Sequence, residues 1–209
     1  MTKVTPELLL QAYASGVFPM ADTAESTAIY WVDPTDRGII PLDGFHLSRS
    51  LAKAIRKSDY TVRINSDFAL TLRHCADREE TWINAEIFDL YCQLHAMGLA
   101  HSLEIWRGES MIGGVYGVTL GTAFFGESMF STATNGSKIA LAFLVHRLRA
   151  AGFTLFDTQF ITPHLQSLGG VEIPRATYHT LLIDALQIRA DFTDAQTPDA
   201  VSLLSDLRP

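Results

Sequence analysis

The sequence contains few cysteines, and they form no recognisable motif. Only two of the 209 residues are cysteine, Cys75 and Cys92, and they are not spaced as CxxC. We therefore expect reduced thiols in a cytosolic protein and no disulfide framework. The seven histidines show no HxxxH or similar spacing. We accordingly expect no metal site.

Long hydrophobic runs are also missing. No apolar stretch approaches the roughly 20 residues that a membrane helix requires, and residues 1–6 contain no apolar region of a signal peptide. Hydrophobic residues still make up 47% of the chain and charged residues 19%. This composition is typical of a globular protein with a substantial core, built as one domain or as a small domain plus a larger one.

Positive charge is scarce overall but concentrated in one region. The net charge is −7, yet residues 37–78 hold eight of the 16 Lys and Arg residues. Residues 48–57 are expected to form a helix, and its basic side chains fall on one face: Arg49, Lys53, Arg56 and Lys57. Such a patch can bind a polyanion. A solvated helix face is the simpler interpretation when no other evidence is considered.

Cap residues and hydrophobic periodicity predict the secondary structure. Helices are expected over residues 6–15, 48–57, 68–76, 85–97, 138–151, 163–168 and 174–186, with N-caps that include Thr5, Asp67, Asn84 and Ser137. Strands are expected over residues 60–64, 101–106, 111–120, 123–130, 153–157 and 171–173. Residues 18–48 are expected to form short strands and loops, and residues 190–209 to be partly disordered.

The order of elements after residue 98 is a hairpin, a third strand, a helix, a strand, a helix and a strand. That order is the core of the GNAT-type acyltransferase fold. We therefore expect an α+β protein with a small N-terminal α/β domain (1–65), a GNAT-like acyltransferase domain with a mixed sheet (66–190) and an acidic C-terminal tail (191–209). Such a fold does not by itself determine the function.

Three polar residues interrupt or follow apolar runs. Glu127 lies within the run 126–131, and Asp157 and Gln159 end the run that begins near residue 153. On a strand, positions two apart share a face, so Asp157 and Gln159 are expected to face one surface, with Glu127 opposite them on a neighbouring strand. Burying a carboxylate is costly unless it is paired. Either a satisfied core network or a functional site explains the pattern.

Short blocks along the chain resemble one family. In sequence order they fall at 12–19, 31–38, 45–50, 77–83, 100–106, 113–117, 126–131, 137–138, 157–159 and 167–175. Through these blocks the chain resembles the bacterial leucyl/phenylalanyl-tRNA–protein transferases. The resemblance covers residues 12 to about 178, and no single block would be sufficient alone.

The resemblance implies an enzyme that moves Leu or Phe, and Met less well, from aminoacyl-tRNA to proteins with an N-terminal Lys or Arg. The product is marked for degradation by the N-degron pathway. The reaction is peptide-bond formation from an already activated ester, so we expect neither a cofactor nor a covalent nucleophile. The resemblance further implies a monomer in the cytoplasm.

The resemblance also implies roles for individual residues. Asp157 and Gln159 match the catalytic pair. Because a neutral amide is a very weak base, Gln159 is expected to orient the amine, while proton transfer to Gln159 or help from the tRNA ribose hydroxyl stays open. Substrate-binding residues are Glu127 for an amino group, Trp82 for stacking on the terminal adenosine, Ser128 and Met20, and the side-chain pocket residues Phe124, Val115, Leu144 and Leu148. The basic helix positions match a tRNA-binding helix: Arg49, Lys53, Arg56 and Lys57.

Three departures from the family pattern concern the donor site and the N-terminal part. Met20 stands where the best-known members have a second stacking Trp, and the junction Glu80–Thr81 lacks a Gly. An N-terminal extension that many relatives have is expected to be missing. Two other functions are considered. A CoA-dependent N-acetyltransferase would share the fold, but the turn at residues 134–138 has one glycine and is a poor CoA loop. A non-catalytic tRNA-binding module would not need Asp157 or Gln159.

Overall fold

The computed structural model describes residues 4–21, 23, 26, 29–78 and 81–207. The described helices are α1 (Pro6–Ala14), α2 (Arg49–Lys57), α3 (Phe68–Ala76), α4 (Ala85–Ala96), α5 (Gly136–Ala150), α6 (Pro163–Gln166), α7 (Arg175–Leu186) and α8 (Ala200–Asp206). The described strands are β1 (Phe18–Met20), β2 (Tyr30–Val32), β3 (Asp36–Ile39), β4 (Thr61–Ile64), β5 (Ala100–Arg107), β6 (Ser110–Leu120), β7 (Ala123–Ser131), β8 (Leu155–Gln159) and β9 (Val171–Pro174).

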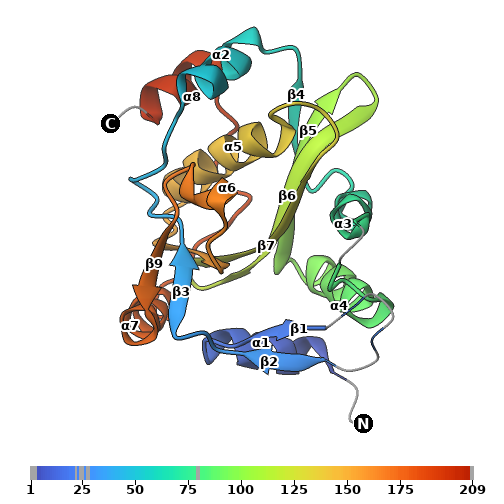
Figure 1. The fold of residues 1–209 in the computed structure, drawn as a ribbon, viewed down its shortest axis with the longest axis vertical. Helices are drawn as coiled ribbons and strands as arrows, with labels where there is room; N and C mark the ends of the chain where they lie inside the picture. The colour runs from blue at the N-terminus through green and yellow to red at the C-terminus, as the bar shows by residue number, and fades with distance from the viewer. Residues whose placement is uncertain (1–3, 22, 24–25, 27–28, 79–80, 208–209) are drawn as a thin grey trace.

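The centre of the molecule is a seven-stranded mixed sheet with the order β4-β5-β6-β7-β8-β3-β9 (Figure 1). β7 and β8 are parallel, and the other neighbouring strands are antiparallel. β1 and β2 form a separate two-stranded sheet that lies with α1 in the small N-terminal part. The predicted α+β class with a small N-terminal domain and a mixed sheet is confirmed.

Helices cover both faces of the large sheet and create two apolar clusters. On one face α5 packs with α2 and α8 over side chains such as Leu103 and Val115. On the other face α1, α3, α4 and α7 pack over side chains such as Tyr116 and Phe125. Side chains of opposite parity on the same strands enter opposite clusters, as the strand period of two requires.

Two glycines allow α5 to lie very close to β6. A Cβ atom at Gly113 on β6 would lie 2.3 Å from the carbonyl carbon of Gly136, at the start of α5. Real Cβ contacts do not approach so closely, so a side chain there would push the helix off the sheet. The pair of glycines therefore fixes the position of the α5 N-terminus beside the ends of β6 and β7.

Most cap predictions are confirmed. The side chains of Thr5, Asp67 and Asn84 each accept a hydrogen bond from the backbone amide three residues later, at the starts of α1, α3 and α4. The prediction for Ser137 was wrong by two residues. α5 begins after Asn135, which has a φ of 68° and makes no side-chain cap, and the Ser137 amide donates to Ser131 Oγ at 3.2 Å.

The prediction of partial disorder over residues 190–209 was also wrong for the part that the structure describes. Asp199 caps α8 by accepting from the Ser202 amide at 2.7 Å. Phe192 is buried against the α5 face of the sheet, together with apolar side chains of α8. Acidic residues in this segment have partners, because Asp206 Oδ2 accepts from His146 Nδ1 at 2.9 Å. Apolar residues spaced between the acids therefore hold the segment on the protein.

β3 precedes residue 65 in the sequence but lies between β8 and β9 in the large sheet. The domain limits at residues 65 and 190 stay a prediction.

Among the described helices, none is both long enough and apolar enough to cross a bilayer.

Candidate active site

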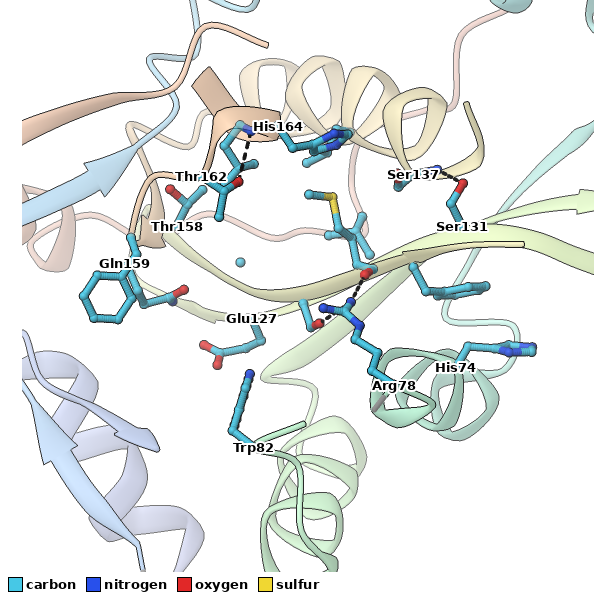
Figure 2. Close-up of a pocket in the computed structure, with 18 of the residues that line it drawn as sticks. His74, Arg78, Trp82, Glu127, Ser131, Ser137, Thr158, Gln159, Thr162 and His164 are labelled. Carbon is cyan, nitrogen blue, oxygen red and sulfur yellow. Dashed lines mark hydrogen bonds between the residues drawn. The ribbon is translucent and has the colours of Figure 1, made fainter. Parts of the chain in front are cut away.

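A cavity of about 750 Å³ opens beside the ends of β7 and β8. Its wall is formed by the N-terminus of α5, by β1, by the segments that follow α3 and β8, and by α6. Figure 2 shows labelled side chains around it from α3 and the segment that follows it, from β7, from β8 and the segment that follows it, and from α5 and α6. Its lining includes Met20, Arg78, Trp82, Val115, Glu127, Ser128, Leu141, Phe156, Thr158, Gln159 and His164.

Asp157 is fully buried and fully hydrogen-bonded just behind the cavity wall. Arg37 binds it with two bonds, Nε to Oδ1 at 2.9 Å and Nη2 to Oδ2 at 2.6 Å. Tyr178 Oη donates to Oδ2 at 2.8 Å, and the Gln159 backbone amide donates to Oδ1 at 2.8 Å. Such a bidentate pair satisfies both charges in the dry interior. Arg37 thereby fixes the carboxylate where it accepts the hydrogen bond from the Gln159 backbone amide.

Gln159 does line the cavity, whereas Asp157 does not. The expectation that the two share one surface is corrected. Gln159 has a φ of 57° and so leaves the strand conformation at the last residue of β8. Positive φ is unfavourable for a residue with a side chain, and the bond from its amide to Asp157 helps to hold it.

The side-chain amide of Gln159 has one orientation that satisfies its hydrogen bonds. Its nitrogen then donates to the carbonyl oxygens of Thr158 at 3.1 Å and Gly126 at 2.9 Å. This orientation is assigned from the hydrogen-bond partners. Its two donors are used inside the protein, so the carbonyl oxygen is the part of the amide available to a ligand in the cavity.

Glu127 enters the cavity from β7, between Gln159 and Trp82 in the view of Figure 2. Tyr13 Oη donates to its Oε1 at 2.7 Å, and Tyr91 Oη donates to its Oε2 at 2.7 Å. The two phenol oxygens are themselves 2.6 Å apart. Burial raises the pKa of Glu127 to about 7, against the opposing effect of the two phenol hydrogen bonds.

Other predicted donor-site residues lie around the same cavity. Trp82, Met20 and Ser128 all line it. Arg78 donates to Ser128 Oγ at 3.2 Å and to the carbonyl oxygen of Met129. Glu80, on one side of the predicted Gly-less junction, lies outside the described residues.

The predicted apolar pocket is only partly where we expected it. Val115 lines the cavity. Phe124, Leu144 and Leu148 do not; they are buried in the core on the α5 face. Phe124 packs behind Phe156, with ring centroids 5.5 Å apart. Phe156 and Leu141 form the apolar wall instead. Which apolar side chains reach the cavity depends on how α5 crosses the strands, and this crossing cannot be read from the sequence.

Sequence reasoning missed several residues at the site. The buried partners of Asp157, Arg37 and Tyr178, were not identified, and neither were the partners of Glu127, Tyr13 and Tyr91. Tyr13 and Arg37 lie within blocks that resemble the family, so the blocks contained a signal, but pairing across such distances needs the fold. The polar wall residues Thr158 and His164 were also missed.

The basic helix lies away from the cavity wall. On α2 the basic residues are all exposed, while Leu51 and Ile55 are buried beneath them. This confirms the predicted division of the helix into a basic face and an apolar face. The four basic residues are Arg49, Lys53, Arg56 and Lys57. None of them is part of the described cavity lining.

The chain is similar to known proteins of one family over most of its length. A family model described as leucyl/phenylalanyl-tRNA protein transferase matches residues 39–183, and the model of that family's N-terminal domain matches residues 2–35. The chain belongs to this family. A leucyl/phenylalanyl-tRNA–protein transferase of Cereibacter sphaeroides is 62% identical over 202 residues, covering 96% of this chain and 94% of the relative. One from a Ruegeria species is 58% identical over 201 residues, covering 96% of each.

As a family member, the chain is an enzyme with leucyl/phenylalanyl-tRNA–protein transferase activity that uses aminoacyl-tRNA and acceptor proteins. The described part of the chain contains no group of three or more His, Cys, Asp or Glu side chains arranged to bind a metal ion. The cavity is lined by apolar, hydrogen-bonding and charged side chains.

Proposed function

We propose that the cavity holds the aminoacyl end of the tRNA beside the N-terminus of the acceptor protein, and that Gln159 orients the attacking amine. The transferred residue is Leu or Phe, and Met less well; the acceptor begins with Lys or Arg and is thereby marked for degradation by the N-degron pathway. The observation that carries the proposal is the fixed side-chain amide of Gln159. Its carbonyl oxygen can accept a hydrogen bond from a substrate in the cavity.

Gln159 acts by position. A primary amine that donates one N–H to the Gln159 carbonyl oxygen has its lone pair directed elsewhere, toward the ester carbon. Because the neutral amide is a very weak base, it accepts this hydrogen bond without taking the proton. Holding the two reactants in a near-attack geometry supplies a large part of the rate in such reactions.

Asp157 acts through Gln159 and not on the substrate. Its bond to the Gln159 amide maintains the positive φ at that residue, and its pair with Arg37 anchors the carboxylate. Asp157 is therefore proposed as a positioning residue. Replacing it should lower kcat through a misplaced Gln159, with less effect on tRNA affinity.

The donor side chain is proposed to lie against Val115, Leu141 and Phe156, with the terminal adenosine stacked on Trp82 and covered by Met20. Apolar walls discriminate weakly, by roughly 1–3 kcal/mol per methylene, which agrees with acceptance of several apolar residues. The basic face of α2 is proposed to hold the tRNA acceptor stem through phosphate contacts, which carry no sequence information.

The fold of the catalytic domain, the oligomeric state and the cellular location are also proposed. The strand order through β5, β6, β7 and β8 with α5 between β7 and β8 supports a GNAT-like catalytic domain. The protein acts as a monomer. A location in the cytoplasm is proposed because its substrates, aminoacyl-tRNA and newly exposed protein N-termini, occur there.

The test is transfer of radiolabelled leucine from charged tRNA to a peptide that begins with Arg, compared with the same peptide beginning with Ala. We expect labelling of the Arg peptide alone, and a large loss of kcat in Gln159→Ala with charged tRNA still bound. Gln159→Glu is the matched variant, since it keeps the carbonyl oxygen but removes the amide donors. Transfer at the wild-type rate by Gln159→Ala would overturn the orienting role. If neither peptide is labelled while charged tRNA still binds, the result would favour a non-catalytic tRNA-binding module.

A further inference from the structure

Three hydroxyl and carboxyl groups form a closed triangle of contacts at the cavity. Tyr13 comes from α1, Tyr91 from α4 and Glu127 from β7. The distances are 2.7 Å for Tyr13 to Glu127, 2.7 Å for Tyr91 to Glu127 and 2.6 Å between the two phenols. Both tyrosines are completely buried, whereas the carboxylate also lines the cavity.

Counting protons shows that the triangle has two states. Each of the three contacts is a hydrogen bond only if one proton lies in it. The two phenols supply two protons, so one contact lacks a proton when Glu127 is ionised. When Glu127 is protonated, its hydroxyl donates to one phenol, that phenol donates to the other, and the second phenol donates back to the carboxyl group. Taking up a proton therefore completes a hydrogen-bond ring between two buried phenols and a half-buried carboxyl group.

We propose that Glu127 is the catalytic residue that receives the proton of the attacking amine, and that Tyr13 and Tyr91 are its positioning residues. This inference rests on the proposed transfer reaction. The amine nitrogen forms a bond to the ester carbon, and the bond from that carbon to the ribose oxygen breaks. The proton lost by the nitrogen passes to Glu127 and then to the departing ribose oxygen, so Glu127 ends the cycle as it began.

Gln159 cannot perform this step, because its amide is neutral and both amide donors are bound to backbone carbonyl oxygens. Asp157 cannot perform it either, because four hydrogen bonds occupy its oxygens behind the cavity wall. Among the described residues that line the cavity, Asp77 is the other carboxylate, and it is exposed to solvent. Glu127 is the half-buried carboxylate of the cavity, and it lies near Gln159 in Figure 2.

The charged and titratable groups around Glu127 determine its proton affinity. The phenols of Tyr13 and Tyr91 favour the anion by donating to it, Arg37 on β3 favours the anion, and Asp157 on β8 opposes it. Burial is the largest influence and raises the pKa of Glu127 to about 7. A general base is most effective when its pKa lies near the working pH.

The decisive experiment measures kcat for leucine transfer to the Arg peptide as a function of pH at saturating charged tRNA and peptide. The acceptor amine titrates identically with every enzyme, so any difference between variants reports the protein. Tyr91→Phe and, independently, Tyr13→Phe remove one donor to the anion and should move the lower pH limb upward. Glu127→Gln should remove that limb and lower kcat at least about a hundredfold, with little change in the KM for charged tRNA.

Tyr116→Phe is the matched control. Tyr116 is a buried tyrosine whose ring lies 5.4 Å from that of Tyr91, but its hydroxyl has no hydrogen-bond partner among the described residues. We expect its pH profile to match that of the wild type. An unmoved limb in both Tyr13→Phe and Tyr91→Phe, or a Glu127→Gln enzyme that changes only the KM for charged tRNA, would overturn the proposal. Absence of transfer by the wild type would instead refute the proposed function.

Discussion

Two ion pairs with nearly equal lengths should contribute very differently to stability. Arg37 Nη2 and Asp157 Oδ2 are 2.6 Å apart, with side chains 1% and 0% exposed. Lys57 Nζ and Asp59 Oδ2 are 2.7 Å apart, with side chains 71% and 33% exposed. Removing one charge of a buried pair leaves the other uncompensated and costs about 3–5 kcal/mol, whereas an exposed pair contributes about 0–1 kcal/mol.

The perturbation is Asp157→Asn, which retains the shape of the side chain and removes its charge. We expect the free energy of unfolding to fall by about 3–5 kcal/mol. For a chain of this size each kcal/mol lowers Tm by about 2–4 °C, so Tm should fall by about 6–20 °C. Lys57→Met should change Tm by no more than about 4 °C by the same relation. Circular dichroism measures both variants: urea unfolding gives the free energy of unfolding and thermal unfolding gives Tm.

A double variant separates the pair from its surroundings. Arg37→Met with Asp157→Asn removes both charges, so its cost should be less than the sum of the two single variants. If Asp157→Asn and Lys57→Met destabilise equally, burial does not determine the strength of this pair. The explanation of how Gln159 is held would then fail as well.

Three further predictions concern other parts of the molecule. Lys53→Glu on α2 should weaken charged-tRNA binding and reduce its salt dependence without changing Tm, as filter binding at several salt concentrations would show; equal affinity would exclude α2 from the tRNA site. Gly113→Ala should destabilise the protein by about 1–3 kcal/mol, because the new methyl group meets the backbone of Gly136, and an unchanged urea midpoint would contradict that close approach. Burial lowers the pKa of His101 to about 4, so between pH 6.5 and 4 the unfolded chain binds the extra proton and stability falls as pH falls; relative to the wild type, His101→Gln should lose this slope in urea titrations.

Local signals predicted much of the fold. Thr5, Asp67 and Asn84 cap their helices as expected, because a cap depends on a few neighbouring backbone groups. The start of α5 was misplaced because Asn135 adopts a positive φ and Ser131 binds the Ser137 amide. That arrangement depends on how β7 meets the helix, which the sequence of the turn does not reveal.

The sequence analysis predicted some of the residues that line the cavity and one residue behind its wall, Asp157, but it missed wall residues such as Phe156 and Leu141. Glu127 and Gln159 were recognisable as polar residues in apolar runs. The buried partners of Asp157 and Glu127 were not recognisable. Arg37 and Tyr178, which bind Asp157, are 141 residues apart, and Tyr13 and Tyr91, which bind Glu127, are 78 residues apart. A single Tyr or Arg in a sequence can occur in many structural environments. Which of these side chains contact one another depends on the order of strands in the sheet.

The position of β3 between β8 and β9 has a consequence for synthesis on the ribosome. Arg37 leaves the ribosome early, but its carboxylate partner lies 120 residues later and its phenol partner 141 residues later. Until those residues emerge, β3 has neither neighbour in the sheet, and Arg37 has no counter-charge at the place where it will be buried. Pairing over such sequence separations is slow to form. A partly synthesised chain therefore lacks the support of Gln159, so the transferase should acquire activity only after α7 has been made.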